Sequence, residues 1–182
     1  MRFDHPQFFL GDIFTVNTPT RATLSGINGG TLGVRDTLIC MRDFVRDAIR
    51  DPQQRIREMA LEIVRSLPER AYGQEVAALH AWVRDNIRYV QDPEGLELVA
   101  TPIKTVQYGQ GDCDDKSTLL AALLTSLNHP SRFAAVGLDG NPISHVLVET
   151  RVGDRWIPLE TILNVEPGWY PPNVTSKFLL KV

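Results

Sequence analysis

The sequence predicts an α+β fold in which N-terminal helices and a cysteine-bearing helix pack on an antiparallel β-sheet. Helical periodicity dominates residues 36–89 and returns at 113–127, whereas three β-like runs all follow residue 130. Helices first and consecutive strands last favour antiparallel pairing in one sheet. The 182 residues, 43% of them hydrophobic and 23% charged, suit one domain with its own core.

An N-terminal arm is expected before the main domain. The first 33 residues are rich in Gly, Thr and Pro, and their apolar runs at 8–10 and 13–14 are short. Glycines at 29, 30 and 33 close the stretch in the manner of a loop. We therefore predict an irregular or short-strand arm over 1–33, lying on a main domain at 34–182.

Three helices are predicted before residue 90. In 36–50 the apolar side chains recur at spacings of three and four. Asp51 and Pro52 then suit an N-cap and a first helical position, and the second apolar stripe ends at Leu67. The third helix is expected at about 74–89. We expect these helices to pack as one small layer.

The second half of the chain is expected to carry one helix and three strands. Residues 96–110 resemble a loop, and the leucine-rich helix 113–127 stops at Asn128-His129-Pro130. Runs at 132–138, 143–152 and 155–159 are β-like, with turns at 139–140 and 153–154. The second turn predicts a hairpin that places the last two runs side by side.

Charge and composition exclude several classes of function. The net charge of −3 argues against nucleic-acid binding. No apolar run approaches the ~20 residues that span a bilayer, and the first residues lack the apolar centre of a secretory leader. The two cysteines, Cys40 and Cys113, cannot form a disulfide framework, which suits a reducing compartment. We expect a cytoplasmic protein without nucleic-acid or membrane partners, and its oligomeric state stays undetermined.

The segment 109–115 carries the sharpest chemical signal, because a glycine-containing loop leads into a helix that starts with a cysteine. Asp112 is a good N-cap, which would make Cys113 the first helical residue. Free backbone N–H groups and the helix dipole there favour a thiolate and can stabilise an oxyanion. Asp114 and Asp115 oppose this effect, because nearby negative charge raises a thiol's pKa. The alternative for Cys113 is a small buried residue beside a helix cap.

Four histidines are candidate bases for such a thiol. His5 lies in the arm, His80 falls on the apolar seam of the third helix as an expected core residue, and His129 sits in a turn expected at the surface. His145 opens a β-run directly after a turn, where a strand end beside the cysteine helix would hold the imidazole rigidly. The alternative for His145 is an exposed residue at a strand edge.

A third group is needed to orient the imidazole. Glu160 ends the last β-run, and the predicted hairpin would bring it beside the strand of His145. Glu149 lies further along that same strand and Asp154 lies in the turn, so both fit less well. The alternative for Glu160 is an ordinary surface glutamate.

These three segments, in this order, resemble the core of transglutaminase-like cysteine enzymes. The motifs are Gly-Asp-Cys113-Asp-Asp-Lys-Ser, Ser-His145-Val-Leu-Val-Glu and Trp-Ile-Pro-Leu-Glu160-Thr, with separations of 32 and 15 residues. Residues 82–95 and the helical stretches at 37–41 and 56–64 are similar to segments that precede the cysteine in bacterial and phage members. The resemblance covers about residues 34–165 and implies a papain-like core.

The resemblance also implies the site residues. It assigns Cys113 as nucleophile, His145 as base and Glu160 as the orienting acid, although the family usually has aspartate as its third member. Glutamate is one methylene longer and can still accept the imidazole N–H.

An oxyanion donor is harder to place. Gln107 lies six residues before the cysteine, where papain-like enzymes have a glutamine, and Tyr108 is the second candidate. Gln110 and Trp82 are rivals.

No metal or cofactor is expected. Asp112, Asp114 and Asp115 miss the calcium-loop pattern, which would have Lys116 at its fifth position. Gly109 and Gly111 stand without the rest of any phosphate-binding fingerprint.

The resemblance implies thiol-dependent acyl transfer at amide bonds of a protein or peptide, through a thioester on Cys113. Hydrolysis by a peptidase or amidase is favoured over amine transfer by a transglutaminase, because the bacterial members suggest it and water needs no second substrate site. A different class also stays open: a non-catalytic structural or assembly module of a phage or prophage, with a place in the virion if the chain is phage-encoded.

Overall fold

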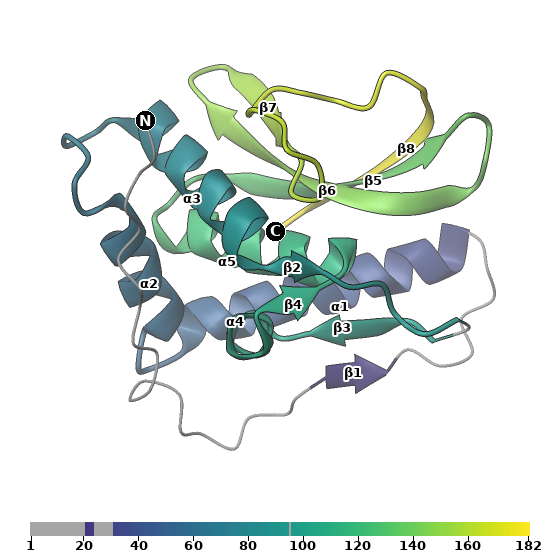
Figure 1. Cartoon of the computed structure of the whole chain (residues 1–182), viewed down its shortest axis with the longest axis horizontal. Coiled ribbons are helices and arrows are strands. Elements are labelled where there is room, and N and C mark those ends of the chain that lie inside the picture. The colour runs from purple at the N-terminus through teal and green to yellow at the C-terminus, as the bar shows by residue number, and fades with distance from the viewer. Residues whose placement is uncertain (1–20, 24–30, 95) are drawn as a thin grey trace.

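The computed structural model describes residues 21–23, 31–94 and 96–182. Helices precede the main sheet in the chain, and that sheet is antiparallel throughout, so the predicted α+β class is confirmed. Its strand order is β7-β6-β5-β8 (Figure 1). His5 and most of the predicted arm lie outside the described residues.

Four helices form the part of the domain that precedes the cysteine helix. They are α1 (Thr31–Arg50), α2 (Arg55–Val64), α3 (Tyr72–Asn86) and the short α4 (Pro102–Tyr108). Their apolar faces meet in one core with α5 (Cys113–Ser126), which packs against all four of them and against the sheet. Figure 1 shows α5 between the sheet and α1. Because α5 is surrounded, its side chains are buried on almost every face, including Leu120 and Leu123.

The main sheet consists of β5 (Ser131–Leu138), β6 (Ile143–Val152), β7 (Arg155–Leu159) and β8 (Val174–Lys181). The first three strands confirm the predicted runs and their hairpins. The fourth strand was not predicted, and it pairs antiparallel with β5, which therefore lies inside the sheet. On the face away from the main core, Tyr170 packs against a small cluster of Ala134, Val136 and Leu147.

The prediction of a loop at 96–110 was wrong. Strand β3 (Leu98–Ala100) pairs antiparallel with β1 (Arg21–Thr23), α4 follows it, and β4 (Gln110–Gly111) pairs in parallel with β2 (Arg88–Tyr89). The short β2–β4 pair explains why α3 ends at Asn86 instead of continuing to residue 89.

Helix boundaries also differ from expectation at Asp51 and Pro52. Residues 51–54 form a turn and α2 begins at Arg55, so Asp51 is not the N-cap. Its carboxylate instead accepts the backbone N–H of Gln53 at 3.1 Å and the Nε of Arg55 at 2.8 Å. The side chain thus stabilises a turn between α1 and α2, and α1 itself begins at Thr31, earlier than predicted.

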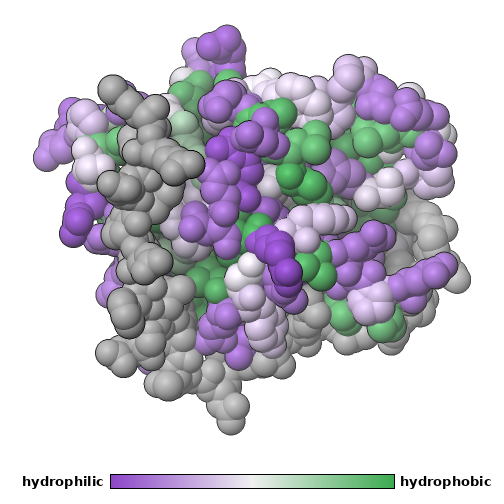
Figure 2. All heavy atoms as spheres, viewed as in Figure 1, coloured by the Kyte–Doolittle hydropathy of each residue, from purple (hydrophilic) through white to green (hydrophobic). Residues whose placement is uncertain are grey.

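Among the described residues, no helix is long and apolar enough to cross a membrane. On the face shown in Figure 2, hydrophobic residues occur as small groups among hydrophilic ones.

Candidate active site

Cys113 is the first residue of α5, and the residue before it caps the helix. Oδ1 of Asp112 accepts the backbone N–H groups of Asp114 at 3.0 Å and Asp115 at 3.2 Å. The predicted N-cap is therefore confirmed, and the half-buried thiol lies at the N-terminal end of a helix that the core holds rigidly. A glycine is required just before this cap: a Cβ at Gly111 would lie 2.4 Å from the Cβ of Asp115.

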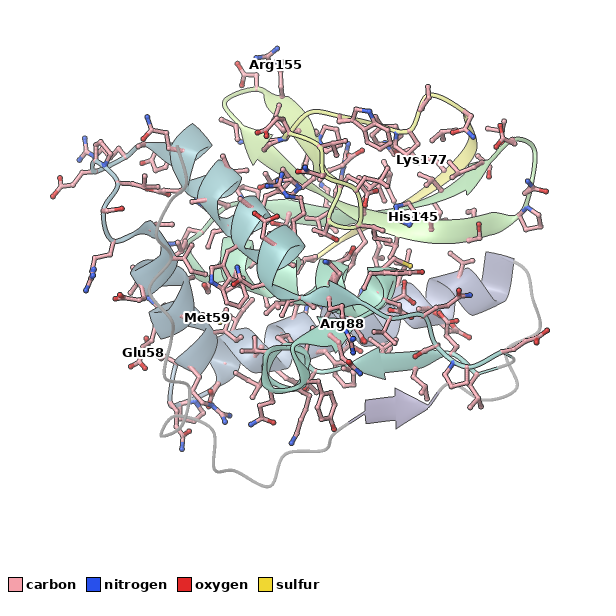
Figure 3. The ribbon with its side chains drawn as sticks, in the orientation of Figure 1. Glu58, Met59, Arg88, His145, Arg155 and Lys177 are labelled. Atoms are coloured by element: carbon pink, nitrogen blue, oxygen red, sulfur yellow. The ribbon has the colours of Figure 1, made fainter. Side chains whose placement is uncertain are left out.

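The strand that carries His145 passes beside this helix end. Ser117 Oγ, one turn into α5, donates to the carbonyl of Val146 at 3.2 Å, while the thiol of Cys113 itself donates to Oδ1 of Asp114 at 3.5 Å. Val146 directly follows His145, so the cysteine helix and the histidine strand meet at adjacent residues. His145 projects from β6 (Figure 3) and keeps 16% of its side chain exposed.

His145 and Glu160 form a hydrogen-bonded pair. The Nε2–H of His145 donates to Oε2 of Glu160 at 2.6 Å, because a carboxylate can only accept. In the neutral ring, Nδ1 is then the basic nitrogen. Glu160 is not a surface residue: its exposed fraction is 2%, and its second oxygen accepts the backbone N–H of Ile162 at 2.7 Å.

The pKa of Glu160 is lowered by these contacts. Burial acts in the opposite direction, but the hydrogen bond and charge of His145 and the backbone N–H groups of Ile162 and Leu163 stabilise the ionised form. The carboxylate is therefore charged at neutral pH, as a group that orients an imidazolium must be.

The thiol of Cys113 has a pKa raised well above its ordinary value. Burial is the largest cause, followed by the negative charges of Asp114 and Asp112, while the N–H of Val146 acts in the opposite direction. These effects outweigh that of the helix dipole, which would lower the pKa of the thiol. The sequence predicted that Asp114 and Asp115 would raise this pKa. Asp114 does so, and the second aspartate that raises it is Asp112 instead of Asp115.

The acidic groups beside the thiol also raise one another's pKa. Burial and a hydrogen bond with Glu97 raise the pKa of Asp114 well above its ordinary range. Burial and the charge of Asp115 raise the pKa of Asp112 to about 7. These crowded carboxyl groups therefore keep their protons to a higher pH than isolated aspartates do.

Asp112, Cys113 and Asp114 each offer a ligand atom, and these atoms lie within 4.8 Å of one another. Carboxylate oxygens are the donors that a hard cation such as Ca²⁺ takes, so Asp112 and Asp114 fit such an ion in donor type. A cation bound there would supply positive charge beside the thiol.

The predicted oxyanion donors lie on or beside α4. Tyr108 is exposed, Gln107 is half-buried, and Oε1 of Gln110 accepts from Arg88 Nη2 at 2.6 Å. Trp82 packs against the main core from α3.

Tyr89 was missed by the sequence analysis. It lies on β2, paired in register with Gly111, and burial and the charge of Cys113 raise its phenol pKa. The β2–β4 pairing brings it to the site, and no local sequence signal points to that pairing.

Two other candidates, Glu149 and His129, form ion pairs of their own. Glu149 is buried on β6 and bonds with Arg132 and Lys177, both at 2.5 Å. Asp154 lies in the β6–β7 turn. His129, expected at the surface, is buried and pairs with Glu75 at 2.9 Å, because the chain turns inward after α5.

His80 is fully buried on α3, as predicted for a core histidine. Its Nε2 also lies 2.5 Å from the backbone carbonyl oxygen of Glu160, a contact that the sequence analysis did not predict.

A buried lysine connects the cysteine helix to α3. Lys116 Nζ donates to the carbonyls of Ile87 at 2.5 Å and Arg84 at 3.2 Å, and burial lowers its pKa to about 8. These bonds hold the first turn of α5 against the end of α3, and the charges of Asp85 and Glu160 favour the protonated lysine.

The fold and this arrangement define a class. The chain belongs to the transglutaminase-like superfamily, whose family model matches residues 57–161 and so includes Cys113, His145 and Glu160.

Solved structures with the same fold are similar to the chain at low identity. LapG of Legionella pneumophila, in a calcium-bound structure, is 14% identical, with a TM-score of 0.54 over 78% of this chain and 83% of that one. A candidate protease from Parabacteroides distasonis is 13% identical, with a TM-score of 0.53 over 68% of this chain, and the chain spans only 26% of that protein. No curated protein matches the sequence significantly.

Proposed function

We propose that the chain is a thiol-dependent peptidase or amidase in which Cys113 is the nucleophile, His145 the base and Glu160 the group that orients His145. The observation that carries the proposal is the 2.6 Å hydrogen bond from His145 Nε2 to the buried carboxylate of Glu160, on a strand that Ser117 of the cysteine helix joins at the next residue, Val146. Descriptions of fold relatives as a protease add support.

The resting thiol holds its proton, because burial and the aspartates raise its pKa. We therefore assign the proton transfer to the attack itself: Nδ1 of His145 takes the thiol proton as sulfur bonds to the amide carbonyl carbon. The charge of Glu160 stabilises the imidazolium that forms. Because the Asp112 cap takes the backbone N–H groups of Asp114 and Asp115, we assign the oxyanion to the backbone N–H of Cys113.

Collapse of this intermediate breaks the C–N bond, and the imidazolium gives its proton to the leaving amine. Water then attacks the thioester with His145 again as base, which releases the acid and restores the thiol. We favour water over a second amine, because amine capture must overcome ~55 M water by positioning a second substrate.

The test measures two reactions on the full chain with a panel of peptides and unfolded proteins. One assay detects new peptide termini or ammonia, and the other detects incorporation of a fluorescent primary amine. Each is run with Ca²⁺ and with EGTA, because a calcium-bound form of LapG is known. We expect hydrolysis with little amine incorporation.

Two cysteine variants provide the matched controls. Cys113→Ser should abolish hydrolysis. Cys40→Ser, which replaces the half-buried cysteine of α1, should retain it. Amine incorporation that depends on Cys113 would show that the chain transfers amines, and it would overturn the assignment of hydrolysis. Absence of both reactions, together with a Cys113 that iodoacetamide does not modify selectively, would refute catalysis and favour a binding module.

A further inference from the structure

The carboxylate of Glu160 is held by its own chain and by His145, but its backbone needs a separate support. The β6–β7 ladder ends at the pair Val148↔Leu159, so Glu160 lies one residue beyond the last strand pair. The carbonyl oxygen of Glu160 lies 2.5 Å from Nε2 of His80, which supplies its hydrogen bond. A residue 80 positions earlier in the chain therefore supports this peptide group where the sheet no longer does.

The chemistry of this contact fixes the tautomer of His80. A carbonyl oxygen can only accept, so Nε2 carries the hydrogen and donates it. Nδ1 is buried and has no hydrogen-bond partner among the described residues, which makes a second proton on the ring costly. Burial lowers the pKa of His80 and Arg84 acts in the same direction, whereas Glu160 and Glu166 act against them. The ring of His80 is therefore neutral, and its single N–H, on Nε2, donates to the carbonyl of Glu160.

Helix α3 is a rigid base for such a donor. His80 is fully buried, its neighbour Leu79 is equally buried in the main core, and α5 packs on the same helix. Lys116 further connects α5 to the end of α3 through two carbonyls. The helix that carries the thiol and the histidine that holds Glu160 therefore share one support.

We propose that His80 is a positioning residue that acts through Glu160: by holding the carbonyl of Glu160, it fixes the direction from which the carboxylate meets His145. This role rests on the proposed function for its effect on rate, but its effect on geometry stands independently. Loss of the donor leaves the peptide of Glu160 without its bond beyond the strand end, so the His145–Glu160 hydrogen bond lengthens or turns.

The first test compares His80→Leu with His80→Gln, whose amide N–H₂ can again donate to the carbonyl. We expect kcat for His80→Leu to fall ~10–100-fold with little change in KM, because a small misplacement of the catalytic groups is costly. His80→Gln should recover kcat to within about threefold of wild type. In a Glu160→Gln background, His80→Leu should reduce kcat by no more than about twofold, since residues that act as one unit are not additive.

The second test needs no activity. The imidazole N–H proton of His145, assigned by its loss in His145→Ala, should give a low-field proton NMR signal in wild type and in His80→Gln. In His80→Leu the signal should shift or broaden. Leu79→Ala removes core packing from the neighbouring position of α3 and is the control for destabilisation alone; it should keep the signal.

An unchanged signal and unchanged kcat in folded His80→Leu would overturn the proposal, as would the same change in Leu79→Ala. If no variant and no wild type hydrolyses any substrate while the signal responds as expected, the proposed function fails and the positioning role of His80 stands.

Discussion

Replacing Glu160 by glutamine tests the hydrogen-bonded pair most directly. The carboxylate accepts two N–H groups, from His145 at 2.6 Å and from Ile162 at 2.7 Å. Glutamine has almost the same shape but only one acceptor oxygen, so one of the two N–H donors must face an N–H₂ group. Either His145 adopts the wrong tautomer, or the turn at Ile162 loses its bond.

The magnitude follows from the bond that is lost. A hydrogen bond to a charged, buried group contributes ~1.5–3 kcal/mol, and Glu160 is 2% exposed, so we expect Glu160→Gln to be about 2 kcal/mol less stable at pH 7. General-base catalysis contributes ~10²–10⁴-fold, and kcat should fall within that range because the imidazole is no longer oriented with Nδ1 free.

The stability difference should depend on pH in a defined direction. The pKa of Glu160 is lower in the folded chain than its ordinary value of 4.5. Its carboxylate therefore stabilises the fold fully above pH 4.5, and this contribution disappears as the pH falls through the folded-state pKa. Wild type and Glu160→Gln should converge in stability at that acidic end.

Urea titration and peptide hydrolysis measure the two effects, with Glu149→Gln as the matched control. Glu149 is 3% exposed on β6 and bonds with two cationic side chains, so its replacement should cost at least as much stability. It should leave kcat of the folded protein within about threefold of wild type, because it holds no group of the catalytic set. Full activity in Glu160→Gln, or an equal loss in Glu149→Gln, would refute the reasoning.

Three further changes probe the cysteine helix. Leu120→Ala, at a fully buried position of α5, should lower the free energy of unfolding by ~2–5 kcal/mol in urea titration. Gly111→Ala should lower it by ~1–3 kcal/mol, because the new Cβ would meet Asp115 at 2.4 Å, whereas Gly73→Ala in open space on α3 should gain up to ~1 kcal/mol. Asp114→Asn in a Cys40→Ser background should raise the rate of Cys113 alkylation up to ~10-fold at a pH high enough to ionise Asp114, because it removes a charge that raises the thiol pKa; an unchanged rate would contradict this cause.

Several features could be predicted because they depend on few, nearby residues. The N-cap at Asp112 is an interaction over three positions, and it placed Cys113 at the start of α5. The turn at 153–154 predicted the β6–β7 hairpin and hence the approach of Glu160 to the strand of His145. The sequence contained a further local signal that was missed: Pro102 is a typical first residue of a helix, and α4 begins there.

Other features depend on residues far apart in the chain, and only the tertiary structure decided them. Strand β8 is exposed at most of its side chains, so its pattern does not separate it from a polar tail, and pairing with β5 makes it a strand. Asp51 is a separate case, because its bond with Arg55 is local: residue type alone favoured an N-cap over the turn that this bond stabilises.

The tertiary structure also decided the electrostatics of the site. A cysteine at a helix N-terminus predicts a lowered pKa, yet burial between α5 and β6 and the crowding of carboxylates raise it. Sequence by itself determined which side chains can carry the chemistry, because residue type and short spacing set donors, acceptors and caps. Tertiary packing decided their protonation and support, as with His80 and Glu160, because desolvation and contacts across 80 residues exist only in the folded chain.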